Sequence, residues 1–107
     1  MLGGAAVNVT VLHIEDCPNV EPLLAELEEL LGGEPGAVLS AVCVHTEAEG
    51  SSIGFHGSPT ILVDGRDPFP APPGPPRLSC RLYRDAAGRV LGYPAREELA
   101  KALRIET

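Results

Sequence analysis

The stretch EDCPNV, residues 15–20, contains a side chain that could act as a nucleophile. It is a cysteine, Cys17, placed directly before a proline. It follows an apolar run and precedes an amphipathic segment, so Cys17 is expected near the start of a helix. Backbone N–H groups at a helix N-terminus stabilise the reactive thiolate form, whereas the neighbouring Glu15 and Asp16 oppose it. The residues alone leave two interpretations for Cys17, a reactive thiol or a half-buried residue of a turn.

A dithiol redox motif does not fit this stretch. A Cys-x-x-Cys pair would need a second cysteine at position 20, where this chain has Val20. The sequence allows two positions for the start of the helix. With Cys17 as the N-cap, Pro18 loses no hydrogen bond, but Pro22 crowds a carbonyl in the second turn. With Asn19 as the N-cap, Pro22 falls in the first turn, where proline is tolerated, and Cys17 lies two residues outside the helix.

Two further cysteines lie on predicted strands. Cys80, in LSCRLYRD, is expected on the strand next to the one that Pro59 opens. There it either approaches Cys17, as a resolving thiol or a partner in holding a soft metal ion, or fills a half-buried strand position. Cys43 lies between two valines and is predicted to be core. No histidine and cysteine share a zinc-ligand spacing such as Cys-x-x-Cys, so we predict no metal site.

Positive charge gathers around the last predicted strand. Three arginines, Arg77, Arg81 and Arg84, accompany Tyr83 there. We interpret them as a solvated face, because exposed ion pairs of this kind are common. The alternative is a surface that receives an anionic substrate such as glutathione.

Hydrophobic periodicity predicts the elements that position these residues. Strands are expected at 6–14, 37–45 (buried), 60–65 and 78–85, and helices at 20–33 and 95–105, with a short helix or turn from about residue 46. Residues 66–77 are proline-rich and are predicted to form a surface loop. The order β-α-β-(α)-β-β-α predicts one α/β domain over residues 1–107, with a four-stranded mixed sheet and helices on both faces.

Composition narrows the partners. The 107 residues suit one compact domain, and a formal charge of −7 argues against nucleic acid and anionic membrane surfaces. No signal peptide is recognisable, and no apolar stretch approaches the roughly 20 residues of a membrane-spanning helix. An odd number of cysteines does not suit a secreted disulfide framework. We therefore predict a cytoplasmic protein with reduced thiols; the oligomeric state is not indicated.

The position of Cys17 between the first strand and first helix, together with GSPTILVDG at 57–65, resembles the thioredoxin superfamily. The resemblance covers nearly the whole chain. Members of that superfamily carry a cis-proline just before the third strand, and here Ser58, Pro59 and Thr60 take those positions. The chain lacks the second motif cysteine and looks closer to small bacterial thioredoxin-like proteins with DCPN and LSCRLYR. Some of those carry labels relating them to alkylmercury lyase.

The resemblance implies a substrate site beside Cys17. A cis bond before Pro59 would expose the N–H and C=O of Ser58 to an extended peptide or thiol substrate, with Pro18 and Thr60 at the same site. Reactive thiols of this superfamily are found at the position of Cys17, so the resemblance favours the reactive interpretation. It implies no cofactor beyond glutathione as a possible co-substrate.

Three functions follow as expectations. The first is a monothiol disulfide or glutathione-linked oxidoreductase in which Cys17 attacks, Pro59 aligns the substrate and Cys80 or glutathione resolves the product. The second is a non-catalytic binding module that docks a protein partner around the Pro59 loop and the proline-rich segment. The third is the handling of a metal or an organomercurial by Cys17 and Cys80.

Overall fold

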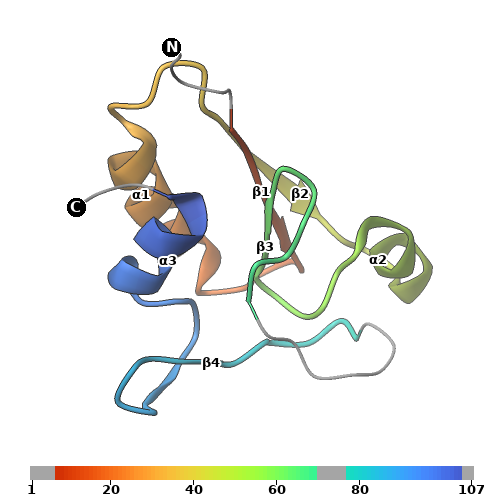
Figure 1. Ribbon diagram of the computed structural model, residues 1–107. Coiled ribbons are helices and arrows are strands. Elements are labelled where there is room, and N and C mark those ends of the chain that lie inside the picture. The colour runs from red at the N-terminus through yellow and green to blue at the C-terminus, as the bar shows by residue number, and fades with distance from the viewer. Residues whose placement is uncertain (1–6, 70–76, 105–107) are drawn as a thin grey trace.

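The computed structural model describes residues 7–69 and 77–104 (Figure 1). Within these residues, eight helices and strands follow one another. They are β1 (Asn8–His13), α1 (Val20–Leu31), β2 (Val38–Cys43), α2 (Glu47–Ile53), β3 (Thr60–Val63), β4 (Tyr83–Arg84), β5 (Val90–Leu91) and α3 (Arg96–Leu103). Both long predicted helices and the short helix after residue 46 are present, as are the first three predicted strands.

The main sheet has three strands in the order β2-β1-β3. Its central strand, β1, runs parallel to β2 and antiparallel to β3, and Val11 lies opposite Ala41 on one side and Ile61 on the other. The β-branched residues of β1 suit a strand flanked on both edges. This arrangement brings the end of β1, which leads to Cys17, beside the beginning of β3, which follows Pro59.

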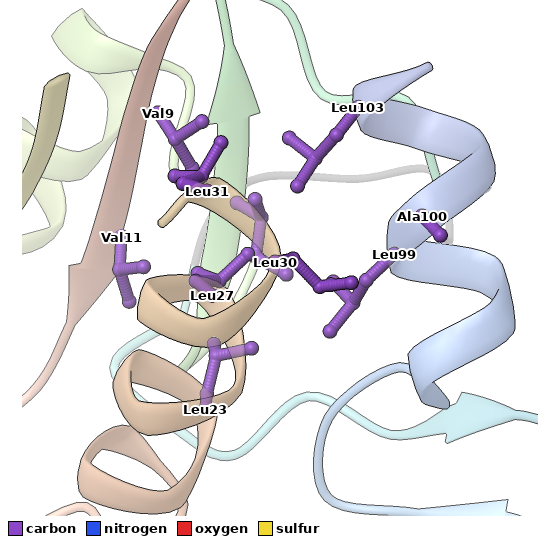
Figure 2. Packing of buried hydrophobic residues seen from close by; sticks show 10 residues of the cluster. Val9, Val11, Leu23, Leu27, Leu30, Leu31, Leu99, Ala100 and Leu103 are labelled. Carbon is purple, nitrogen blue, oxygen red and sulfur yellow. The ribbon is translucent and has the colours of Figure 1, made fainter. Parts of the chain in front are cut away.

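One face of the sheet packs against α1 and α3, which lie on the same side (Figure 1). Alternate residues of β1 and β3 point to this face, and leucines at spacings of three and four point back from the helices. Figure 2 shows the resulting aliphatic core. It contains Val9, Val11, Leu23, Leu27, Leu30, Leu31, Ile61, Leu99, Ala100 and Leu103.

The opposite face carries a smaller cluster. Leu12, Val44 and Phe55 are buried together there, and Phe55 lies two residues after the end of α2. The ring of Phe55 lies so close to α2 that a Cβ added at Gly50 would be 3.1 Å from a ring carbon. Glycine at position 50 thus allows α2 to pack closely against the Phe55 ring. The helix lies on the side of the sheet away from α1 (Figure 1).

The predicted four-stranded sheet is wrong. In the part of the chain that the structure describes, β4 pairs antiparallel with β5 in a separate two-stranded sheet, with Tyr83 opposite Leu91. From the predicted strand 78–85, a single isolated bridge links Cys80 to Ser58, ahead of β3.

The surroundings of β3 explain why the fourth strand does not form. At one end, Pro59 has no N–H to donate to a neighbouring strand. At the other, a tight turn folds Arg66 back onto Val63, with N–H to carbonyl bonds of 2.7 and 3.1 Å in the two directions. A further strand therefore cannot form a continuous hydrogen-bond ladder along the outer edge of β3. The hydrophobic alternation of the sequence does not reveal this, because it depends on contacts in the folded chain.

The second strand differs from its prediction in burial. β2 is an edge strand with most of its residues exposed, including Val38 at 52% and Val42 at 42%. Cys43 is consequently half-buried and not a core residue as predicted. The Val- and Ala-rich sequence indicated burial, but apolar β-branched residues also suit an edge position.

The proline-rich loop is described only at its ends. Its predicted span, 66–77, includes residues 70–76, which lie outside the described residues, so the loop prediction is untested there. Among the helices of the described residues, none is long and apolar enough to cross a membrane.

Candidate functional site

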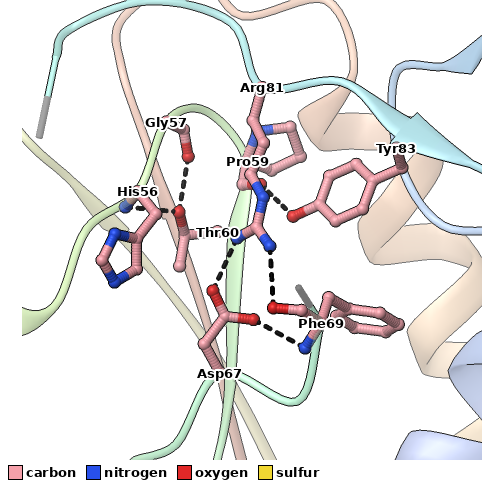
Figure 3. Close-up of polar contacts among 8 residues, drawn as sticks. All are labelled: His56, Gly57, Pro59, Thr60, Asp67, Phe69, Arg81 and Tyr83. Carbon is pink, nitrogen blue, oxygen red and sulfur yellow. Dashed lines mark hydrogen bonds and ion pairs between the residues drawn. The ribbon is translucent and has the colours of Figure 1, made fainter. Parts of the chain in front are cut away.

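The turn from Gly57 to Thr60 is held by several hydrogen bonds (Figure 3). The Ser58–Pro59 peptide bond is cis, as predicted, and Gly57 has a φ of 104°. The buried Thr60 hydroxyl donates to the Gly57 carbonyl at 2.5 Å and accepts from the His56 N–H at 2.9 Å. Thr60, predicted to bind substrate, is thus engaged in holding the turn.

Ser58 connects this turn to the strand that leads to Cys17. Its side chain is fully buried, and its hydroxyl oxygen accepts the N–H of Ile14 at 3.1 Å. Ile14 lies three residues before Cys17. One hydrogen bond therefore joins the Ser–Pro junction to the residue that follows β1, three residues before Cys17.

The helix after Cys17 begins late. Asn19 is the N-cap of α1, which leaves Cys17 two residues outside the helix and puts Pro22 in the first turn. The Cys17 carbonyl accepts from the Val20 N–H at 3.4 Å, so the cysteine belongs to the turn that enters the helix. Cys17 is a free, half-buried thiol, and the neighbouring Pro18 is exposed.

The backbone groups of Ser58 are not exposed to a substrate. The Ser58 N–H donates to the Ser79 carbonyl at 2.8 Å, and the Ser58 carbonyl accepts from the Arg81 N–H at 2.9 Å. The chain's own segment 79–81 thus occupies the place where the resemblance implied an extended peptide. Hydrophobic periodicity cannot predict this pairing, because Ser58 and segment 79–81 are about twenty residues apart in the sequence.

Arg81 anchors that segment (Figure 3). Its side chain is buried, bonded to the Asp67 carboxylate at 2.6 Å and to the Phe69 carbonyl at 3.2 Å. Its guanidinium carbon also lies 4.6 Å from the centroid of the Tyr83 ring. The prediction of a solvated arginine is therefore wrong at this position, because a buried carboxylate and a carbonyl replace the water around the guanidinium.

Tyr83 completes the anchor. Its hydroxyl donates to the Pro59 carbonyl at 2.6 Å, and its ring meets the Phe69 ring edge to face with centroids 5.7 Å apart. Burial raises the pKa of the Tyr83 hydroxyl. The hydroxyl therefore keeps the proton that it donates to Pro59, and this bond holds the junction in addition to the bond from Ile14.

Cys80 lies between these fixed points. It is the bridge partner of Ser58, and it is an exposed, free cysteine. The structure therefore brings Ile14, Ser58 and Cys80 together, with Cys17 three residues along the chain from Ile14.

A second group of reactive side chains was not predicted. One ligand atom from each of Glu15, Cys43 and His45 lies within 4.8 Å of the other two. Burial and the charges of Glu15, Glu49 and Asp16 together raise the pKa of the Cys43 thiol. A signal was present in the sequence: Cys43 and His45 are two residues apart at a strand end, a spacing that puts both side chains on one face.

Comparison of the chain with protein-family models, with curated proteins and with solved structures found no match. The relation to the thioredoxin superfamily accordingly stays a prediction from the residues quoted above.

Proposed function

We propose that the protein is a thiol–disulfide oxidoreductase in which Cys17 is the attacking thiol and Cys80 the resolving thiol. One observation carries the proposal: Ser58 is bonded through its hydroxyl to Ile14 and through its backbone to the residues on either side of Cys80. Both thiols are free, and neither is fully buried. Two cysteines attached to one rigid turn are a suitable pair for thiol–disulfide exchange.

The reaction proceeds in two balanced exchanges. The Cys17 thiolate attacks a substrate disulfide, forms a mixed disulfide and releases one substrate thiolate. The Cys80 thiolate then attacks the Cys17 sulfur, releases the second substrate thiolate and leaves an intramolecular disulfide. Two molecules of glutathione reduce that disulfide and become oxidised glutathione. This chemistry suits a cytoplasmic protein, where thiols are kept reduced.

In this proposal, the turn that contains Ser58 and Pro59 positions the segments that carry the two cysteines. Pro59 is fully buried, and its carbonyl is held by Tyr83. Ser58 holds Ile14 on the Cys17 side and the Cys80 segment on the other. Ser58 and Pro59 are therefore positioning residues in this proposal, and neither offers its backbone to the substrate.

The binding-module alternative places a partner around the Pro59 loop and the proline-rich stretch. At the loop, both backbone groups of Ser58 are bonded to segment 79–81 and cannot pair with a partner. Its second attachment, the proline-rich stretch, lies mostly in residues 70–76, outside the described part. The organomercurial alternative needs the same two thiols, Cys17 and Cys80, and no observation favours it over disulfide exchange.

The test is turnover of a peptide carrying a glutathione mixed disulfide, with reduced glutathione as the second substrate and oxidised glutathione as the measured product. Cys17→Ser is expected to reduce the rate to the uncatalysed background. Cys80→Ser is expected to slow turnover while leaving the first exchange at Cys17 intact, because glutathione then replaces the resolving thiol. Cys43→Ser is the matched control and should retain the full rate.

Two results would overturn the proposal. One is a Cys17→Ser variant as active as the parent chain. The other is a parent chain that does not exceed the background reaction of glutathione with the peptide.

A further inference from the structure

The ends of β1 and β2 place a sulfur, an imidazole and a carboxylate together. The two strands are parallel, and their last paired residues are His13 and Cys43. Glu15 and His45 lie two residues further along their respective chains. Extending the register therefore makes Glu15 and His45 neighbours, and the ring Nδ1 of His45 lies 3.7 Å from the Glu15 carboxylate.

Val44 orients the two ligands on the β2 side. It is buried against Leu12 and Phe55, and its N–H donates to the His13 carbonyl at 2.6 Å. Successive residues of an extended chain project to opposite sides, so the residues flanking Val44 project away from that cluster. Cys43 and His45 consequently share one outer face with Glu15, and their ligand atoms lie within 4.8 Å of one another.

The surrounding charges suit a cation. The carboxylates of Glu15, Glu49 and Asp16 all lie close enough to the Cys43 thiol to raise its pKa. Glu49 also fixes the local backbone, since its carboxylate accepts the N–H of His45 at 3.0 Å. The backbone that carries His45 is thus tied to α2.

The donor set discriminates among metals. A thiolate, an imidazole nitrogen and a carboxylate oxygen are the three ligand types of zinc sites. Calcium and magnesium take oxygen ligands, so a set with sulfur and nitrogen disfavours them. Three protein ligands leave one tetrahedral position open for water or another ligand.

We propose that Glu15, Cys43 and His45 form a zinc-binding site at the outer end of the β1–β2 pair. On binding, the Cys43 thiol releases its proton to solvent and forms a sulfur–zinc bond. The ion would join the turn after β1, the end of β2 and, through His45, the start of α2. The site uses no residue of the proposed thiol reaction, so it extends beyond that function.

The test is metal titration of the full chain with Cys17 and Cys80 both replaced by serine, which leaves Cys43 as the remaining thiol. Cobalt(II) serves as the spectroscopic probe, because a thiolate ligand gives an intense near-ultraviolet charge-transfer band and a tetrahedral site gives strong visible bands. Zinc should then displace cobalt. We expect one ion per chain and both sets of bands.

Ligand variants separate the site from general metal binding. In this background, Cys43→Ser should abolish the charge-transfer band. Glu15→Gln and His45→Ala change exposed positions. Loss of a group that only supports a metal ligand weakens binding by about 10–100-fold, and we expect these two variants to weaken zinc binding by more than that. His56→Ala, at an exposed histidine outside the cluster, is the matched control and should leave the affinity unchanged.

A cobalt spectrum without a thiolate band would overturn the proposal, as would equal affinity of the Cys43→Ser and parent backgrounds. Circular dichroism of each variant, compared with the parent, verifies that Glu15→Gln and His45→Ala stay folded. Failure of this test would not affect the thiol reaction, which is measured with different cysteines.

Discussion

The N–H of Ile14 donates to the hydroxyl oxygen of Ser58 across a sequence separation of 44 residues, at 3.1 Å. This bond joins the residue after β1 to the cis-proline turn. The chain leaves the sheet here and reaches Cys17 three residues later. Because the same serine bonds to segment 79–81 through its backbone, it connects the two cysteines of the proposed reaction. The hydroxyl of Ser58 is therefore the feature on which the site geometry depends most.

Ser58→Ala removes the acceptor for Ile14 without changing the backbone. Because Ser58 is fully buried, the Ile14 N–H loses its partner, and we expect a loss of about 1–3 kcal/mol in the free energy of unfolding. Denaturant unfolding measures this. Ser51→Ala, at an exposed position of α2, is the control and should change stability by no more than about 0.5 kcal/mol. Equal stability of the two variants would contradict the importance of the bond.

Gly57→Ala tests the contact between the turn and the Cys80 segment. At Gly57, φ is 104°, and an added Cβ would lie 2.9 Å from the Arg81 Cβ, which cannot move without its backbone. Gly88→Ala is the matched control, since its φ is 83° but nothing lies within 4 Å of the added atom. The control should lose only the about 1–2 kcal/mol of a left-handed alanine.

The expected result is a larger loss of stability for Gly57→Ala than for Gly88→Ala, together with faster alkylation of Cys80 as segment 79–81 is displaced. Thermal unfolding and timed labelling measure the two effects. If Gly57→Ala and Gly88→Ala behave alike, segment 79–81 does not pack on the turn as described.

Asp67→Asn tests the buried ion pair with Arg81. The side chains are 2% exposed for Arg81 and 12% for Asp67, so the substitution leaves a buried guanidinium without its carboxylate. Removing one member of such a pair costs about 3–5 kcal/mol. Lys101→Met, which removes the exposed pair with Glu98, should cost at most about 1 kcal/mol. Urea unfolding of both variants gives the comparison, and similar values would show that the Arg81 pair is not desolvated.

Asp85 predicts a pH dependence. Its carboxylate accepts from the backbone N–H groups of Arg89 and Ala87, each at 2.9 Å, and the Arg89 backbone bond is the main cause of its lowered pKa. A lowered pKa in the folded protein gives stability that is present above the unfolded value of about pH 4 and is lost as pH falls through the folded value.

Asp85→Asn should therefore lower the melting temperature more at pH 7 than at pH 2, where acid favours the protonated carboxyl in the parent. Glu34→Gln, at an exposed residue outside the β4–β5 hairpin, serves as the control. A difference between parent and Asp85→Asn that is the same at both pH values would show that the carboxylate charge does not stabilise the β4–β5 hairpin.

Local patterns predicted much of the fold. The leucine spacing identified α1 and α3, and the Thr46 region did form a capped helix, α2, whose N-cap side chain accepts from the Glu49 N–H. The resemblance carried by the Ser–Pro–Thr stretch implied the cis bond at Pro59, and the structure has it. These features depend on residues close together in the sequence, which is why the sequence alone was informative.

Pairing across long separations was not predictable. The strand expected at 78–85 has the alternation of a sheet strand, yet beside β3 it makes one bridge at Cys80, because Pro59 and Arg66 close the outer edge of β3. Its last residues pair with β5 in a separate sheet. Burial of Arg81 depends on Asp67, which approaches it only in the folded chain. The cluster of Glu15, Cys43 and His45 likewise depends on the β1–β2 register.

The central claim is that Cys17 and Cys80 react with each other, and mapping of disulfides in the oxidised full chain tests it most directly. The reduced protein is treated with oxidised glutathione, digested without reduction and analysed by mass spectrometry, in parallel with Cys43→Ser. We predict that a peptide pair linked through Cys17 and Cys80 is the main product in both proteins. A stable glutathione adduct on Cys17 beside a free Cys80, or disulfides formed mainly through Cys43, would contradict the account.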